Sequence, residues 1–297
     1  MSMKRERSMS MSRSPSIGSP QLDHFATHGW VYVQNVLSPS ELRVLQTESS
    51  ALYSCQSAES IVAQGCVVDV LAQCPMRDSD RARIEFNCYL EARSKNKSVE
   101  DQRVFGSLLF EKLPTIAGKM LAAFDKSEVA TDMFFFNEHY VIKPPKSHVE
   151  FRWHRDDDEQ LAMCVHRESI HTYVSVWCAL DDVTTVNGPL RFVSLNVLPE
   201  SDKDNVESRK LHASGPVTAA AGDVVFFLSN VWHCSSSNES NTFRRAFYAQ
   251  YSRETITSRP KDPSPLSFAI PCITASAAWF INGFAEGSAT KSKHLQL

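Results

Sequence analysis

The chain has 297 residues and a formal net charge of −3, with 42% hydrophobic and 10% aromatic residues. This length and composition suit one large globular domain, and a net charge near zero gives no reason to expect a nucleic-acid partner or a charged membrane surface. No apolar stretch approaches the roughly 20 residues that a membrane-spanning helix requires.

Residues 1–20 are rich in Ser, Met and Arg, and their single acidic residue is Glu6. They lack the apolar stretch of a secretory signal, so we predict a disordered tail followed by one domain over residues 21–297. The eight cysteines form no C-x-x-C pair, which predicts reduced thiols and argues against a zinc site. We therefore expect a cytoplasmic protein. A mitochondrial location is the alternative, because transit peptides are also rich in Arg and Ser.

Helical patterns dominate the first half of the domain. A Ser-Pro-Ser-Glu cap signal predicts a helix over residues 38–53, residues 77–104 predict helix plus loop, and residues 105–123 have apolar side chains at helical spacing. Strand patterns follow, with β-branched and aromatic residues over strand lengths. The predicted strands cover residues 133–142, 172–180, 224–228 and 243–251.

The connections between the predicted strands are of three kinds. Residues 161–169 are predicted to form a loop or lid, Asn187-Gly188 a turn between strands, and residues 201–209 a polar loop. Residues 262–297 contain an Ala-rich apolar patch around Trp279 and Phe280. This patch either closes the β structure or makes a homodimer contact.

Four polar residues in the second half form the pattern with the most chemical information. His154 and Asp156 make an H-x-D, His233 follows the apolar run 224–228, and Arg244 comes eleven residues after His233. Two imidazoles and one carboxylate are the ligand set of non-haem Fe(II) oxygenases. Side chains i and i+2 of a strand share a face, so we expect the H-x-D to hold one ion from one strand.

Arg244 suits a different task, because a guanidinium binds a carboxylate through a fixed fork of two hydrogen bonds. Fe(II) oxygenases commonly bind 2-oxoglutarate, a dicarboxylate whose distal carboxylate needs such a fork. We expect a strand, a turn and a neighbouring strand to bring His233 and Arg244 to one end of a cavity. Adjacent strand residues face opposite ways, so only one of Arg244 and Arg245 can face that cavity. Considered without the other residues of the pattern, His154 could be a surface histidine and His233 could be an ordinary half-buried histidine.

Residues 22–252 resemble the phytanoyl-CoA dioxygenase family of Fe(II)/2-oxoglutarate oxygenases. The resemblance runs through LDHFATHGWVYVQNVLSPSEL, through YVIKPP before the H-x-D, through YVSVWCALDDVTTVNGPLRF after it, and through the spacing of His233 and Arg244. It implies a mainly β fold with flanking helices, a double-stranded β-helix (jelly roll, cupin-like barrel) that includes a strand at residues 30–33. It also implies a small-molecule dioxygenase that uses Fe(II), 2-oxoglutarate and O2.

The resemblance assigns roles residue by residue. His154, Asp156 and His233 would be the iron ligands and the catalytic centre, and Arg244 would pair with the 2-oxoglutarate carboxylate. Ser235, Trp177 and His139 match positions that line the co-substrate pocket. Halogenating relatives have a small residue in place of the carboxylate, so Asp156 favours hydroxylation of a small organic molecule, lipid-like or a secondary metabolite.

One departure limits inferences about the substrate. After NGPLRF many members continue into a Pro-Gly-Ser-His turn, where this chain has VSLN. This change leaves the metal ligands in place but puts in doubt any substrate taken from particular relatives. An acyl-CoA would favour a basic surface at the cavity mouth, and the sequence shows no Lys/Arg cluster there.

Two other functions remain open at this point. One is a non-catalytic sensor of the same fold that binds 2-oxoglutarate or a metal. The other is a cupin-type metal enzyme without 2-oxoglutarate, in which Arg244 would be a salt-bridge arginine. The expected partner is a small-molecule substrate, with no nucleic acid and no membrane span, and a second copy of the chain is the alternative partner.

Overall fold

The computed structural model describes residues 17–70, 81–95, 97–129, 132–163, 170–197, 205–257, 266 and 268–272. The strands are β1 (Trp30–Val33), β2 (Val67–Val68), β3 (Met133–Lys143), β4 (Phe151–His154), β5 (Val174–Ala179), β6 (Leu190–Phe192), β7 (Val224–Leu228), β8 (His233–Ser235), β9 (Arg244–Ser252) and β10 (Ile270–Cys272). The helices are α1 (Ser19–His28), α2 (Pro39–Ser54), α3 (Ala58–Ala63), α4 (Arg81–Ser94), α5 (Val99–Ser107), the π-helix η2 (Leu108–Lys112), α6 (Leu113–Asp125), α7 (Asp156–Met163) and α8 (Val206–His212).

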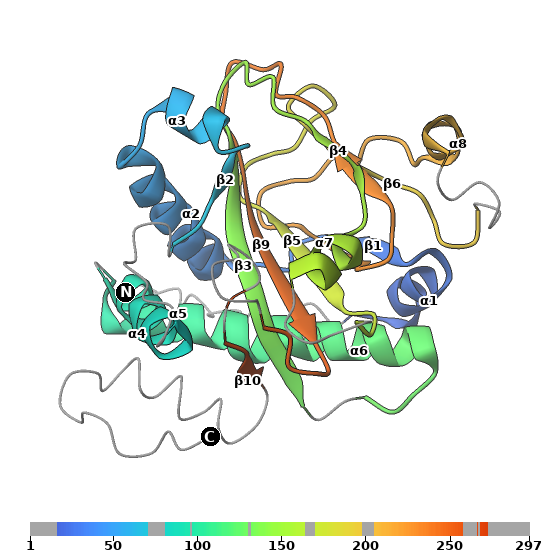
Figure 1. The fold of residues 1–297 in the computed structure, drawn as a ribbon, viewed down its shortest axis with the longest axis horizontal. Coiled ribbons are helices and arrows are strands. Elements are labelled where there is room, and N and C mark those ends of the chain that lie inside the picture. The colour runs from blue at the N-terminus through green and yellow to red at the C-terminus, as the bar shows by residue number, and fades with distance from the viewer. Residues whose placement is uncertain are drawn as a thin grey trace, which may run out of the picture.

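The strands form two antiparallel sheets (Figure 1). The larger has the order β1-β7-β5-β9-β3-β10, with β2 also paired to β3, and the smaller has the order β4-β8-β6. Helix α6 runs across the large sheet in Figure 1 and contacts β3 and β5. This arrangement confirms the predicted β fold with flanking helices. No backbone ladder between the described strands joins the two sheets, so the jelly roll is not a closed barrel.

The strand predictions agree closely with the structure, because buried strands have a strong local signal. Strands β1 and β7 have the predicted bounds, and β3, β5 and β9 lie within a residue or two of theirs. Every residue of β5 and β7 is buried. These two strands are neighbours in the middle of the sheet, so both of their faces are covered and their sequences are continuously apolar.

Local capping explains where the first helices begin. Ser38 Oγ accepts a hydrogen bond from the Glu41 N–H, and the Glu41 carboxylate accepts one from the Ser38 N–H, which is a capping box at the start of α2. Helix α1 begins at Ser19, one residue before the predicted end of the tail at residue 20, and residues 1–16 lie outside the described part. The helical segment predicted at 105–123 is interrupted by η2, where a π turn separates α5 from α6.

Two predicted loops are partly helical. Helix α7 continues through Met163 into the segment predicted as a lid, and residues 164–169 lie outside the described part. The segment predicted as a polar loop at 201–209 contains the start of α8, because Asn205 Oδ1 accepts from the N–H groups of Glu207 and Ser208 and caps that helix. Within the described residues, the polar part of this segment from Val206 to Arg209 is therefore helical, and residues 201–204 lie outside the described part.

The C-terminal segment and the cysteines differ in part from expectation. Strand β10 pairs with β3 at the edge of the large sheet, while Trp279 and Phe280 lie outside the described residues. Cys88 is disulfide-bonded, so the prediction of reduced thiols is wrong for it. Sequence spacing could not show this, because a disulfide depends on the separation of two Cα atoms in space. Among the described residues, the free thiols are those of Cys55, Cys66, Cys178, Cys234 and Cys272.

Buried ion pairs connect the helical layer to the large sheet. The Arg93 side chain on α4 is 1% exposed and pairs with Glu48 of α2 and Glu138 of β3. Breaking such a pair leaves an uncompensated buried charge, so these contacts specify how the helices dock on β3. In the part of the chain that is described, no helix is both long and apolar enough to cross a membrane.

Candidate metal centre

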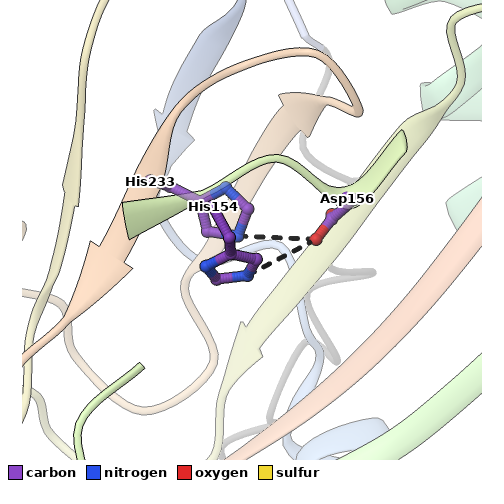
Figure 2. Close-up of side chains that lie close together, drawn as sticks. All are labelled: His154, Asp156 and His233. Carbon is purple, nitrogen blue, oxygen red and sulfur yellow. Dashed lines mark ion pairs between the residues drawn. The ribbon is translucent and has the colours of Figure 1, made fainter. Parts of the chain in front are cut away.

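Three side chains converge between the two sheets (Figure 2). His154 ends β4 and His233 begins β8, and the two residues are direct partners in the antiparallel register. Asp156 Oδ1 lies 3.7 Å from His154 Nε2 and 3.6 Å from His233 Nε2. The potential ligand atoms of the three residues all lie within 4.8 Å of one another, which is a spacing that one metal ion can bridge.

Asp156 reaches this centre from a helix. Strand β4 ends at His154, and Asp156 is the first residue of α7. The prediction that His154 and Asp156 share a strand is therefore wrong. The following run of acidic residues suits the start of a helix, where carboxylates face the positive end of the helix dipole. The side chain still turns toward the histidines, because the chain bends between β4 and α7.

Backbone carbonyls orient both imidazoles. His154 Nδ1 lies 2.7 Å from the carbonyl oxygen of Arg152, and His233 Nδ1 lies 3.0 Å from that of Val231. A carbonyl only accepts, so Nδ1 has the proton in each ring and Nε2 keeps a lone pair that faces Asp156 Oδ1. Burial, with the neighbouring His154, lowers the pKa of His233 to about 4, so this ligand is neutral at pH 7.

The second oxygen of Asp156 is held by two hydroxyl groups. Ser175 Oγ donates to Asp156 Oδ2 at 2.5 Å, and the Tyr248 hydroxyl donates to the same oxygen. Burial opposes ionisation of this carboxyl, but His233, His154 and the two hydroxyl donors outweigh burial and hold its pKa below the ordinary value. Oδ1 is thus left as an ionised oxygen facing the two imidazoles.

A buried glutamine continues this network. Gln250 Nε2 donates to the Tyr248 hydroxyl at 2.7 Å and to Ser175 Oγ at 3.2 Å. Gln250 Oε1 accepts from Asn137 Nδ2 at 2.9 Å and from Gln160 Nε2 at 3.0 Å. Because the Asp156 carboxylate only accepts, the direction of every bond in the chain of partners is determined. Such outer partners fix the orientation of metal ligands.

Sequence reasoning missed Ser175, Tyr248 and Gln250. A signal was present, because Arg244, Tyr248 and Gln250 lie at even spacing along β9 and so share one face. Register then places Gln250 opposite Ser175 and Tyr248 opposite Trp177. The sequence does not contain that register, so it could not connect these residues to Asp156.

The triad opens into a cavity of about 610 Å³ between the sheets. All of the residues predicted for the site line this cavity. They are His154, Asp156, His233, Arg244, Ser235, Trp177 and His139. Other lining residues at the cavity include Asp69, Glu150, Phe151, Arg152, Glu159, Gln160 and Phe227.

Arg244 enters the cavity from the sheet opposite the histidines. His233 is in β8 of the small sheet and Arg244 in β9 of the large sheet, so the prediction that they lie on neighbouring strands is wrong. Arg245 faces the other way, as adjacent strand residues must, and pairs with Asp181 through Nε at 2.8 Å and Nη2 at 2.6 Å.

The Arg244 guanidinium is 1% exposed and only partly satisfied. Nη2 donates to the Gly188 carbonyl oxygen at 2.7 Å and Nε to that of Asn187 at 3.4 Å, while Nη1 has no hydrogen-bond partner among the described residues. Burial lowers the pKa of Arg244 to about 10, so it remains charged at pH 7. A buried cation with a free donor fits a bound carboxylate.

The fold is similar to those of several solved structures. EvdO2 from Micromonospora carbonacea var. aurantiaca, complexed with 2-oxoglutarate, is 17% identical, with a TM-score of 0.54 over 86% of this chain and 97% of that one. EctD from S. alaskensis, solved with 2-oxoglutarate and 5-hydroxyectoine, is 19% identical, with a TM-score of 0.52 over 85% and 87% of the two chains. The non-haem, alpha-ketoglutarate-dependent carbocyclase SnoK is 16% identical, with a TM-score of 0.52 over 85% and 93%.

At these identities the solved structures show a shared fold, and a comparison with curated proteins found no match. A family model gives the more direct result. The model described as phytanoyl-CoA dioxygenase (PhyH) matches residues 25–246, which include His154, Asp156, His233 and Arg244. The chain therefore belongs to the phytanoyl-CoA dioxygenase (PhyH) family.

Proposed function

We propose that this protein is an Fe(II)- and 2-oxoglutarate-dependent dioxygenase that hydroxylates a small organic molecule. One observation supports this proposal above the others. Two imidazoles and a carboxylate converge within 4.8 Å, and the same cavity contains a buried arginine with an unpartnered Nη1. The first group suits a metal ion with open positions, and the second suits the far carboxylate of a dicarboxylate.

The residues divide into two groups. His154, Asp156 and His233 would hold the iron, and Arg244 with Ser235 would hold the C5 carboxylate of 2-oxoglutarate. When bound, the iron and 2-oxoglutarate supply O2-dependent oxidation of a C–H bond, with succinate and CO2 as co-products. Trp177 lies against the arginine, with its ring centre 5.4 Å from Arg244 Cζ.

The charges at the cavity favour a substrate unlike an acyl-CoA. Asp69, Glu150 and Glu159 line the cavity, and Arg152 is the basic lining residue besides Arg244. The phosphates of a CoA thioester would meet these carboxylates, which is unfavourable. We therefore propose a small lipid-like molecule or secondary metabolite without phosphate groups. Asp156 favours hydroxylation, because a carboxylate rather than a small residue stands at the third ligand position.

The decisive experiment measures turnover of 2-oxoglutarate. Purified protein given Fe(II), 2-oxoglutarate and O2 should form succinate slowly without substrate, and His154→Ala, Asp156→Ala and His233→Ala should each abolish both succinate formation and metal binding. Asp157→Ala is the matched control, since its carboxylate is next to Asp156 but outside the triad.

Four results would contradict the proposal in different ways. Full turnover in any triad variant would remove that residue from the metal site. Tight binding of 2-oxoglutarate without any succinate would indicate a sensor. Metal-dependent activity without 2-oxoglutarate binding would indicate a cupin-type enzyme. Loss of activity in Asp157→Ala but not Asp156→Ala would show that the neighbouring aspartate is the ligand.

A further inference from the structure

A second buried cation lies beside Arg244. Lys143 is 0% exposed and is the last residue of β3, where it is the direct partner of Arg244 on β9. Side chains of opposite partners in an antiparallel pair lie on the same side of the sheet. The point that a Cβ on Gly188 would occupy is 3.2 Å from both Lys143 Cδ and Arg244 Nη2, so both side chains approach one turn.

The Lys143 amine contacts the residue predicted to share the carboxylate. Nζ donates to Ser235 Oγ at 3.0 Å and to the Ser236 carbonyl oxygen, and it lies 5.2 Å from the centre of the Phe151 ring. Ser235 and Phe151 line the cavity, so Lys143 lies directly behind the wall of the cavity. Neither Lys143 nor Arg244 forms an ion pair with any residue in the described part of the chain.

The positive charges of Lys143 and Arg244 repel each other, because both side chains are buried and neither forms an ion pair among the described residues. Burial and the charge of Arg244 lower the pKa of Lys143 to about 7, against weaker opposing effects of Cys66, Glu150 and Cys234. The other charged group near this pair is Asp181, which favours the charged form of Arg244. An anion placed at the free Nη1 of Arg244 would reverse the balance and favour the protonated amine.

The protonation of Lys143 also decides how Ser235 behaves. An ammonium group only donates, so Ser235 Oγ accepts from it and must direct its own proton elsewhere. A neutral amine has a lone pair that can accept that hydroxyl proton instead. Only the protonated lysine therefore makes Ser235 a dependable donor toward an anion in the cavity.

From these contacts we infer that Lys143 is a positioning residue for 2-oxoglutarate, taking up one proton from solvent when the distal carboxylate binds Arg244 and Ser235. This inference rests on the proposed function. The step forms one N–H bond on Lys143 and breaks the bond between that proton and a buffer acid, with no change of oxidation state. The proton moves from buffer to Lys143 Nζ, and the bound carboxylate compensates the added charge.

Calorimetry can measure how many protons the protein takes up when 2-oxoglutarate binds. Binding of 2-oxoglutarate to the Fe(II)-loaded protein under anaerobic conditions is measured near pH 8 in two buffers with different ionisation enthalpies. We expect uptake approaching one proton per site, because the free protein is then mostly neutral at Lys143 and the complex is protonated. Affinity should be constant below about pH 7 and should fall as pH rises, by up to roughly tenfold per pH unit.

A matched ligand and three variants test whether Lys143 is the group that takes up the proton. Pyruvate has the same 2-oxo acid but no distal carboxylate, so it should bind without the uptake. Lys143→Met should bind 2-oxoglutarate more weakly, without uptake and with a flat pH profile. Lys143→Arg keeps a charge that does not titrate and should also show no uptake. Lys146→Met, an exposed lysine whose Nζ donates to the Glu239 carbonyl, should behave as wild type.

The possible failures are distinguishable. If wild-type protein binds 2-oxoglutarate with no more proton uptake than pyruvate, the role of Lys143 is wrong and the proposed function stands. Proton uptake that persists in Lys143→Met would also show that the role of Lys143 is wrong. If Lys143→Met does not fold, persistent proton uptake in Lys143→Arg would show the same. If the wild type binds no 2-oxoglutarate at all, the proposed function and this inference fail together.

Discussion

The two oxygens of the Asp156 carboxylate have different tasks at the residue scale. Oδ1 faces the histidines, while Oδ2 accepts from Ser175 and Tyr248. Because both donors approach Oδ2, the carboxylate cannot rotate freely to exchange its oxygens. We expect this restraint to matter for metal affinity, since outer-shell partners typically affect it by about 10- to 100-fold.

Tyr248→Phe tests that restraint. The variant removes the hydroxyl that donates to Asp156 and leaves Gln250 Nε2 without one of its acceptors. We expect Fe(II) affinity to fall by roughly 10- to 100-fold in an anaerobic competition titration. Tyr251→Phe is the control, because the Tyr251 hydroxyl on the same strand donates to the Leu109 carbonyl away from the cavity. Equal affinities in the two variants would refute the role of Tyr248.

Arg244 and Arg245 provide a second comparison between neighbours. Arg244→Ala should weaken 2-oxoglutarate binding by about 2–5 kcal/mol, or roughly 30- to several-thousand-fold, since a buried carboxylate loses its fork. Arg244→Lys should recover only part of the affinity. Arg245→Ala removes a half-buried pair with Asp181 and should leave the Michaelis constant for 2-oxoglutarate nearly unchanged. If Arg245 were required for 2-oxoglutarate binding and Arg244 were not, the face of β9 that carries Arg245 would face the cavity.

At the scale of elements, the turn between β5 and β6 supports the arginine. Gly188 has φ of 90°, and its carbonyl oxygen accepts from Arg244 Nη2. A Cβ there would lie 2.7 Å from the Ser236 carbonyl oxygen and 3.2 Å from Arg244 Nη2. The turn therefore needs glycine for its backbone conformation and for the close approach of three segments.

A comparison of Gly188→Ala with Gly65→Ala separates the requirement for a positive φ from the requirement for close approach of neighbouring segments. Gly65 also has a positive φ, 69°, but nothing lies within 4 Å of its would-be Cβ. Gly65→Ala should lose about 1–2 kcal/mol of unfolding free energy in denaturant titrations, from backbone strain alone, and Gly188→Ala should lose more, because its Cβ would also meet the Ser236 carbonyl oxygen at 2.7 Å. Only Gly188→Ala should also bind 2-oxoglutarate more weakly, by roughly tenfold or more. Unchanged affinity in Gly188→Ala would show that Arg244 does not depend on this turn.

On the scale of the whole molecule, buried histidines make the fold sensitive to acid. Burial lowers the pKa of His139 to about 4, and the ring stacks on Tyr248 at 4.7 Å between centroids. The unfolded chain, with an ordinary pKa of 6.5, binds more protons than the folded chain between about pH 6.5 and 4. Stability is therefore complete above pH 6.5 and decreases as pH falls through this window.

His139→Gln should reduce this acid sensitivity. The shift corresponds to a loss on the order of 3 kcal/mol by pH 4 for this one residue, so the metal-free variant should show a smaller fall in unfolding free energy between about pH 7 and 5. His171→Gln is the control, because its side chain is 89% exposed. A wild-type slope in His139→Gln would mean that His139 titrates normally in the folded protein.

The sequence by itself determined the identities of the residues that converge. His154, Asp156, His233 and Arg244 were recognisable because their types and order suit one chemistry, and strands such as β7 were recognisable because burial on both faces leaves a continuous apolar run. Both signals are local or depend only on order along the chain. They require no knowledge of which strands are neighbours.

Only the tertiary structure decided how those residues are held. It placed Asp156 on a helix, put Arg244 on the sheet opposite His233, and brought Lys143 beside Arg244 through the β3–β9 register. It also joined Ser175, Tyr248 and Gln250 to the metal centre. Register and sheet pairing depend on contacts between segments far apart in the chain, as in the pairing of Trp30 with Phe227, and no local pattern in the sequence records them.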